Sequence, residues 1–190
     1  MNSVDVQCLG TLLHFYNSRI IGNQDTLYLH FRGNCDGRKV DGNSVCIFED
    51  CYVEGTTDFI FGSAAALFVR CEIRSKADSY ITAASPCMGQ PAGFVFLQCR
   101  LTADEGVDAC YLGRPWRDHA QTCFLSCELG AHIRPAGWHD WNKPHARKTV
   151  RYGEFGCTGP GASAAGRVKW ARKMNSGDAA EALRFFGLPD

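Results

Sequence analysis

A short pattern recurs along the chain and constrains its fold more than any other feature. The pattern is Phe, two variable residues, Cys or Ser, one variable residue and an aliphatic residue. Its copies are Phe15–Ser18–Ile20, Phe48–Cys51–Val53, Phe68–Cys71–Ile73, Phe96–Cys99–Leu101 and Phe124–Cys127–Leu129. They begin 33, 20, 28 and 28 residues apart, as in a solenoid whose strands keep their length while its loops vary. The repeat therefore predicts stacked parallel strands.

The segments around the repeat have the composition of short strands. Residues 44–48 and 92–97 are aromatic and β-branched and are bounded by Gly, Asp, Asn or Pro, so we predict a strand in each. Near the C-terminus, residues 178–186 predict a short capping helix, with Asp178 at the N-cap and Gly187 as the stop. The predicted class is all-β.

The eleven cysteines predict packing rather than metal binding or a disulfide framework. Their number is odd, and the cysteines of the repeat share one phase, where a small apolar side chain would fill the interior. A zinc site needs close pairs such as C-x-x-C, whereas the nearest pairs are Cys46/Cys51 and Cys123/Cys127. The six histidines show no metal spacing either. We expect buried, inert thiols and no metal.

Charge and hydropathy exclude several classes of partner. The formal net charge is zero and the Lys and Arg residues are scattered, so nothing favours nucleic acid or an anionic membrane. No apolar run approaches the roughly 20 residues that a membrane span needs. Residues 1–5 lack the basic and apolar regions of a signal peptide. We expect a cytoplasmic monomer for the chain as written, and secretion if the true start lies upstream.

Two aspartates share one phase of the repeat. Asp25 and Asp58 each follow the first Phe of their copy by ten residues, so stacked strands would place them on adjacent coils roughly 4.8 Å apart. Alone, each would more often cap a loop. Two facing carboxylates cannot comfortably both be charged, so one pKa rises and that group can act as an acid. Asp78 has the same phase but no comparable surroundings, and we interpret it as a turn residue.

Three motifs in order resemble the signature set of the pectin methylesterases. They are Gly-Asn-Gln-Asp-Thr-Leu-Tyr at 22–28, Gly-Thr-Thr-Asp-Phe-Ile-Phe-Gly at 55–62 and Tyr-Leu-Gly-Arg-Pro-Trp at 111–116. The resemblance continues through 137–138 and 152–162 to 168–170. It implies a right-handed parallel β-helix with its active site in a surface cleft. It also implies no cofactor, and methyl-esterified homogalacturonan as the substrate.

The resemblance implies separate roles for the polar residues of these motifs. Asp58 would be the nucleophile, and Asp25 would protonate the departing methanol and then act as base on water. Arg114 would keep Asp58 ionised and oriented through a charge-assisted pair. The amide of Gln24 is suited to the tetrahedral oxyanion, a contribution of roughly 3 kcal/mol in comparable sites.

Aromatic residues near these motifs predict a sugar-binding surface. Trp116 offers a flat apolar face to a sugar ring, although core packing is the alternative. Phe59 and Phe61 alternate along one segment, and we expect Phe61 to face the cleft with Arg114 as a further substrate contact. Residues 80–84 resemble a family segment that lines the cleft. We expect His139 and His145 on the surface and not as metal ligands.

The chain also departs from the family pattern. The family has a second oxyanion glutamine in a Q-A-V-A-L-like segment one coil earlier, and here that position falls near Asn2, while Gln7 is five residues out of phase. We therefore predict a single domain over 1–190 that lacks the N-terminal coils and cap. The Gly/Asp/Asn-rich excursion at 31–43 resembles bacterial members more than plant ones.

Three functions remain open at this point. The first is a pectin methylesterase, and the second is a truncated β-helix that binds pectic polysaccharide without turnover. The third is a lyase or hydrolase on the same solenoid, where a lyase would use Ca²⁺ held by carboxylates. A serine esterase is excluded because the chain contains no G-x-S-x-G motif.

Overall fold

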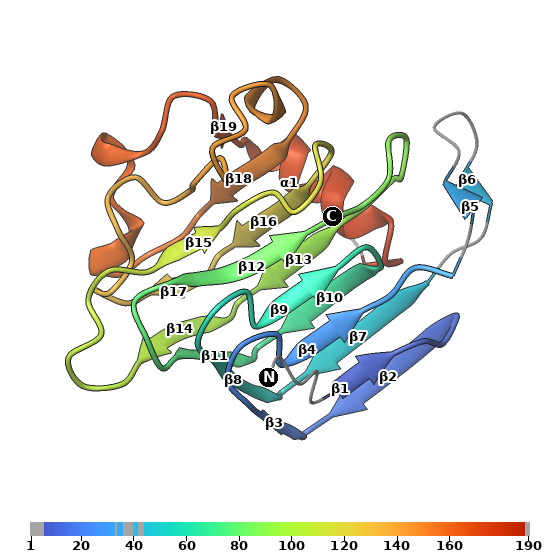
Figure 1. The fold of residues 1–190 in the computed structure, drawn as a ribbon, viewed down its shortest axis with the longest axis horizontal. Helices are drawn as coiled ribbons and strands as arrows, with labels where there is room; N and C mark the ends of the chain where they lie inside the picture. The colour runs from blue at the N-terminus through green and yellow to red at the C-terminus, as the bar shows by residue number, and fades with distance from the viewer. Residues whose placement is uncertain (1–5, 33, 36–39, 42–43, 189–190) are drawn as a thin grey trace.

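The described strands wind into a parallel β-helix, as predicted (Figure 1). The computed structural model describes residues 6–32, 34–35, 40–41 and 44–188. Sheet 1 contains β1 (Val6–Cys8), β4 (Leu27–Leu29), β9 (Ile60–Gly62), β12 (Tyr80–Ala84) and β15 (Tyr111–Gly113). Sheet 2 contains β2 (Leu12–Tyr16), β7 (Val45–Glu49), β10 (Ala65–Val69), β13 (Phe94–Leu97), β16 (Gln121–Leu125), β18 (Arg151–Phe155) and β19 (Arg172–Lys173). Sheet 3 contains β3 (Arg19–Ile21), β8 (Tyr52–Gly55), β11 (Glu72–Ser75), β14 (Arg100–Ala103) and β17 (Glu128–Leu129).

The phenylalanines of the repeat form one stack inside the solenoid. The strands of sheet 2 pair in parallel with Phe48, Phe68, Phe96 and Phe124 in register. Neighbouring rings, from Phe15 onwards, are stacked with centroids 4.9, 4.6, 4.6 and 4.5 Å apart. These separations match the spacing of paired strands. The sequence repeat is therefore the coil of the β-helix.

A single left-handed residue turns the chain from sheet 2 into sheet 3. The residue two positions after each repeat Phe has φ between 47° and 53°, at Asn17, Asp50, Arg70, Gln98 and Ser126. Left-handed backbone costs a residue with a side chain roughly 1–2 kcal/mol. The stacked strands on both sides impose this conformation. The Cys or Ser of the pattern is the residue immediately after the left-handed one.

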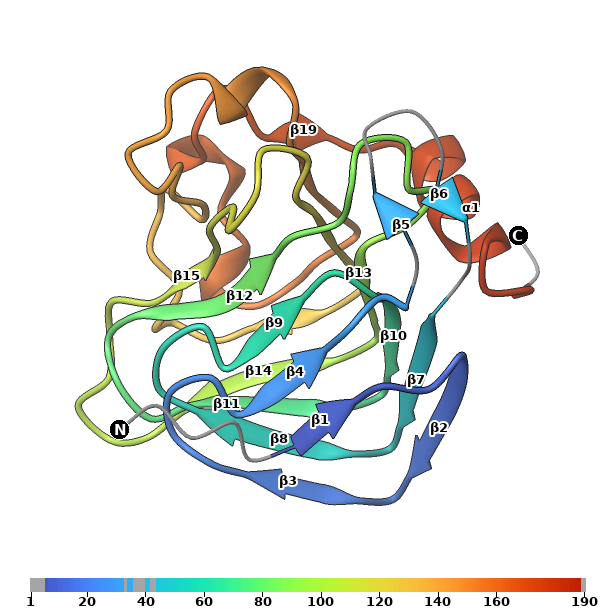
Figure 2. The ribbon, with the colours of Figure 1, turned by 45° about the vertical axis from the view of Figure 1, so that its right-hand side comes forward.

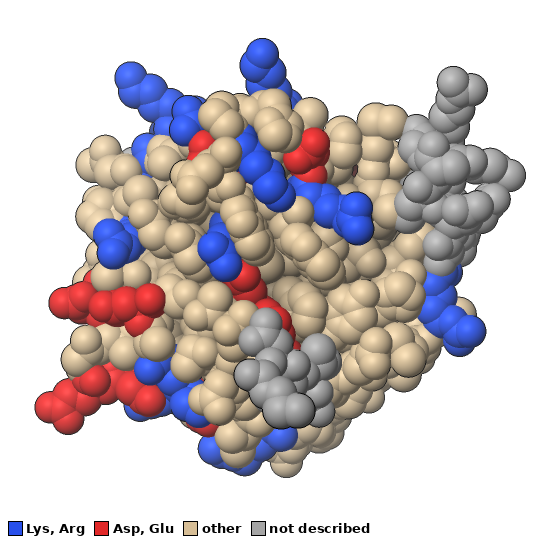
Figure 3. Space-filling view, viewed as in Figure 1, with Lys and Arg blue, Asp and Glu red and all other residues tan. Residues whose placement is uncertain are grey.

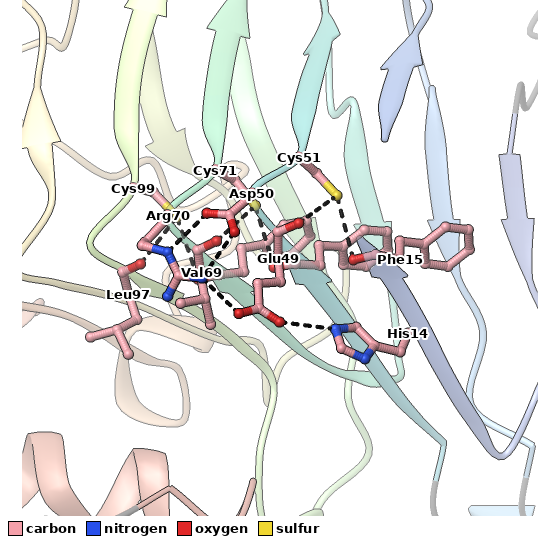
Figure 4. A network of polar contacts seen from close by, with 12 residues as sticks. His14, Phe15, Glu49, Asp50, Cys51, Val69, Arg70, Cys71, Leu97 and Cys99 are labelled. Atoms are coloured by element: carbon pink, nitrogen blue, oxygen red, sulfur yellow. Dashed lines mark hydrogen bonds and ion pairs between the residues drawn. The ribbon is translucent and has the colours of Figure 1, made fainter. Parts of the chain in front are cut away.

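The thiols after this turn are buried, as expected. Cys71 donates to the carbonyl of Phe48 one coil earlier at 3.3 Å, and Cys99 donates to that of Phe68 at 3.4 Å (Figure 4). On the outer side of the same turns, Arg70 bonds Asp50 and Glu49. One cysteine departs from the prediction of free thiols, because Cys87 is disulfide-bonded.

Helix α1 (Ser176–Arg184) covers the outer face of sheet 2 (Figure 2). Ala179 of the helix packs against Val95 and Leu125 of the sheet. The predicted N-cap was wrong by three residues: Asn175 caps the helix, and Asp178 closes the capping box from the third helical position. Among the described residues, no helix is long and apolar enough to cross a membrane.

Irregular segments complete the molecule. Short 3₁₀ helices occupy Ala146–Lys148, Pro160–Ala162 and Ala164–Gly166. Within the predicted excursion at 31–43, β5 (Asn34–Cys35) and β6 (Val40–Asp41) form an antiparallel pair outside the three sheets. This pair lies apart from the coils in Figure 1.

Candidate active site

Asp25 and Asp58 lie on adjacent coils at the entrance to sheet 1. Leu27 of β4 pairs with Ile60 of β9, which places the two aspartates at equivalent positions just before their strands. Both have left-handed backbone, with φ of 57° and 49°. The N–H of Asp25 donates to the carbonyl of Thr57 at 3.0 Å, so the two turns are bonded directly to each other. The predicted juxtaposition of the aspartates is present.

Asp78 is a turn residue, as its surroundings predicted. Thr82 pairs with Ile60, so the register of sheet 1 places Tyr80, and not Asp78, beside Asp58. The N–H of Asp58 accordingly donates to the carbonyl of Tyr80 at 2.8 Å. The carboxylate of Asp78 accepts instead from the N–H groups of 108 and 109, both at 2.9 Å.

A buried arginine fork holds Asp58. Arg114 Nε lies 2.9 Å from Asp58 Oδ1, and Nη2 lies 2.6 Å from Oδ2. The two side chains are only 17% and 8% exposed. The guanidinium lies between two aromatic rings, 3.8 Å from the centroid of Tyr80 and 3.7 Å from that of Trp141. Fork and rings together fix the orientation of the Asp58 carboxylate.

The two carboxylates differ in their electrostatic surroundings. Burial raises the pKa of Asp58, and the hydrogen bonds and charge of Arg114 oppose that rise. Burial also raises the pKa of Asp25, followed by the charge of Asp58, while Arg114 and the amide of Gln24 act in the opposite direction. Asp58 alone has a bidentate cation. The pKa of both carboxyls is therefore raised, and what distinguishes the two groups is that Asp58 is paired with the Arg114 guanidinium.

Aromatic side chains border the aspartates on one side. Phe61 stacks on Tyr28 with centroids 4.8 Å apart, and its centroid lies 5.8 Å from that of Trp116. Trp116 is 38% exposed, so it is not a core residue, whereas Phe59 is fully buried. A groove of about 670 Å³ continues from Tyr28 and Trp116. Its other lining residues are His30, Phe31, Ser63, Ser85, Pro86, Cys87, Met88, Arg117, Asp118 and His119.

The face that carries the aspartates combines both signs of charge. Figure 3 shows a narrow acidic strip near the centre of the view, with a basic side chain at its upper end. Gln24 is exposed beside Asp25. Gln7 lies exposed in β1, where it pairs in register with Tyr28. Asn2 lies outside the described residues. In the described part of the chain, no group of three or more His, Cys, Asp or Glu side chains could hold a metal ion.

The sequence alone did not predict that Trp141 packs on the guanidinium of Arg114. Trp141 and Asn142 are consecutive left-handed residues, with φ of 57° and 55°. The N–H of Trp141 donates to His139 Nδ1 at 3.0 Å, and that of Asn142 donates to Asp140 Oδ1 at 2.9 Å. Local side chains thus stabilise an unusual backbone that places the Trp141 ring on Arg114. The only signal was the Gly-Trp pair at 137–138, which begins the same segment.

Comparisons with known proteins agree with the motif resemblance. A family model described as Pectinesterase matches residues 2–188. Pectinesterase 31 from Arabidopsis thaliana is 37% identical over 166 residues, which are 87% of this chain and 49% of that protein. A solved pectin methylesterase from carrot is 28% identical with a TM-score of 0.74, and the match covers 90% of this chain and 58% of that one. A pectin methylesterase in complex with hexasaccharide VII is 28% identical with a TM-score of 0.70, covering 88% and 54%.

These matches correct the expectation that the segment 31–43 is a bacterial feature, and they show how much of its relatives this chain covers. Curated relatives from Arabidopsis thaliana and Solanum lycopersicum are plant proteins, so the interpretation of 31–43 as a bacterial feature is not supported. Part of that segment lies outside the described residues. The chain spans about half the length of Pectinesterase 31.

Proposed function

The chain belongs to the pectinesterase family, and on that premise we propose that it hydrolyses the methyl esters of homogalacturonan to pectate and methanol. The observation that carries the proposal is the pair of aspartates on adjacent coils, of which Asp58 alone is held by Arg114. Two carboxylates in unlike surroundings are what a two-step ester hydrolysis requires.

In the first step, Asp58 attacks the ester carbonyl. Its ionised oxygen forms a bond to the carbonyl carbon, and the carbonyl π electrons move to the oxygen. Arg114 favours the ionised form of Asp58 and fixes its direction of attack. The exposed amide of Gln24 donates a hydrogen bond to the oxyanion, which we expect to contribute roughly 3 kcal/mol.

In the second step, Asp25 transfers the protons. Its carboxylic acid protonates the methoxy oxygen as the C–O bond breaks, so methanol leaves and an anhydride links the substrate to Asp58. The resulting Asp25 carboxylate accepts a proton from water, whose oxygen attacks the substrate carbonyl and releases Asp58. The raised pKa of Asp25, caused first by burial and then by Asp58, supports this role.

The groove beside Trp116 would hold the neighbouring sugar rings. Phe61, Tyr28 and Trp116 form a continuous aromatic surface, and apolar sugar faces pack on such rings. A solved relative is described as a complex with a hexasaccharide, which supports an oligosaccharide ligand for this groove. Methyl-esterified pectin is therefore the proposed substrate.

The test is methanol release from highly methylated homogalacturonan by the folded chain. We expect methanol and new carboxylates in equal amounts, without new reducing ends. Binding of the polymer without methanol would favour the alternative of an inactive pectin-binding β-helix. Ultraviolet absorbance from unsaturated ends would instead indicate a lyase.

A further inference from the structure

The ammonium of Lys76 reaches back across two coils to the turn before Asp25. Lys76 follows β11, and its Nζ lies 2.9 Å from the carbonyl oxygen of Gly22 and 3.2 Å from Asn23 Oδ1. Its third partner is Glu54 Oε1 at 3.2 Å. An ammonium has three donors, and here each has an acceptor.

Two of these acceptors belong to the turn that carries Gln24 and Asp25. The carbonyl of Asn23 accepts from Thr56 N–H at 3.0 Å and from Thr26 Oγ1 at 2.8 Å. These bonds hold the middle of the turn, whereas the bonds from Lys76 hold its start. Since Asp25 has left-handed backbone, the turn depends on such contacts to keep its shape.

The ion pair between Lys76 and Glu54 is better shielded from solvent than an ordinary surface ion pair. The side chains of Lys76 and Glu54 are 25% and 16% exposed. Glu54 also accepts from the Tyr52 hydroxyl at 2.6 Å, which fixes the carboxylate that faces the ammonium. Arg74, which lies in β11 two residues before Lys76, pairs instead with Asp104 after β14 at 2.7 Å, and these side chains are 32% and 44% exposed. Replacement of Arg74 is therefore the control for replacement of Lys76.

We propose that Lys76 is a positioning residue that sets the location of Gln24 and Asp25 relative to Asp58. The proposal rests on the proposed function for the chemical roles of those residues. Lys76 is not among the residues that line the groove, so its loss should leave substrate binding nearly intact. Displacement of the acid and the oxyanion donor should instead slow the chemical step, because small misplacements of reacting groups are costly.

Three variants test this role. We expect Lys76→Met to lower kcat for methanol release about tenfold with KM changed less than about twofold, and Lys76→Arg to recover part of the loss. Arg74→Met should match the parent in both constants. Amide hydrogen exchange, measured by NMR, should accelerate at Asp25 and Thr56 in Lys76→Met and not in Arg74→Met.

Either measurement, kcat or amide hydrogen exchange, can overturn the proposal. Equal kcat in Lys76→Met and Arg74→Met would contradict it, and so would equal exchange rates at Asp25 and Thr56 in the two variants. If the parent releases no methanol, the proposed function fails, and the exchange rates at Asp25 and Thr56 still decide whether Lys76 positions the turn. If Lys76→Met does not fold, Glu54→Gln replaces it, with a smaller loss expected in the same direction and no loss as the contradicting result.

Discussion

Asp25 and Asp58 have the same backbone conformation and equivalent positions on adjacent coils, yet their side chains have different neighbours. Asp58 is 8% exposed and meets a guanidinium that comes from 56 residues later in the chain. Asp25 is half-buried and meets the charge of Asp58. The proposed division of roles between them therefore rests on tertiary contacts and not on the local motif.

Arg114→Lys tests the geometry of the fork. Lysine keeps the positive charge but cannot form two parallel bonds to Asp58 or stack between Tyr80 and Trp141. We expect kcat for methanol release to fall roughly 100-fold, the size typical of a catalytic group displaced by about 1 Å. An unchanged kcat would show that charge alone, and not orientation, is what Asp58 requires.

Asp25→Asn should stabilise the fold at neutral pH while it abolishes activity. Burial and the charge of Asp58 raise the pKa of Asp25, so the folded state binds its proton more tightly than the unfolded chain. The stability of the parent consequently falls as the pH rises from the unfolded pKa through the folded pKa. The variant should have a larger free energy of unfolding than the parent at pH 7. This difference should vanish as the pH falls below about 3.9, the unfolded value. Urea unfolding at several pH values measures it.

At the scale of the elements, the coil was predictable and its turn was not. The Phe and Cys positions of the repeat indicate the stacked interior because their side chains are apolar and periodic. The left-handed position is occupied by Asn17, Asp50, Arg70, Gln98 and Ser126, whose side chains are all polar but differ in charge and size. The stacking of neighbouring coils, and not local propensity, imposes that conformation.

Cys99 tests what the stacked thiols contribute. Its Sγ donates to the carbonyl of Phe68 at 3.4 Å. Ser18 occupies the same phase of the first copy and donates to the carbonyl of Tyr16 at 3.0 Å. We expect Cys99→Ala to lower the free energy of unfolding by about 1–2 kcal/mol, because burial and a hydrogen bond are lost. Cys99→Ser should cost less in the same denaturant experiment; equal costs would show that the thiol acts by volume alone.

At the scale of the molecule, one end of the described solenoid presents strand edges and apolar side chains. β1, β2 and β3 are the outermost described strands of their sheets. Leu12 and Tyr16 in β2 are 67% and 64% exposed, and Leu9 and Ile21 nearby are 44% and 54% exposed. Such edges favour association with other chains.

The double variant Leu12→Lys, Tyr16→Lys tests this for the 190-residue chain. Charged side chains on an edge strand oppose pairing with another edge, so we expect less concentration-dependent self-association in sedimentation experiments. The outward positions in β2 leave the stacked core unchanged. Association equal to that of the parent would locate the contact elsewhere.

The site was predictable where a residue belongs to a local motif. Asp25, Asp58 and Trp116 have neighbours in sequence that identify them. Trp141 and Lys76 do not, because each acts across coils on a residue from a distant segment. Such contacts depend on the lengths of the loops between strands, and the repeat does not determine those lengths. The same freedom explains Asp78, which has the repeat phase of Asp58 but is out of register in sheet 1.

The rate of methanol release by Asp58→Asn, compared with that of Asp78→Asn, tests the catalytic pair most directly. Both substitutions keep the shape of an aspartate and remove its charge. We expect Asp58→Asn to lose roughly 10⁴-fold in kcat, as hydrolases do without a catalytic carboxylate, with Asp78→Asn close to the parent. Comparable rates in Asp58→Asn and Asp78→Asn, with both variants folded, would contradict the assignment of Asp58 as the nucleophile.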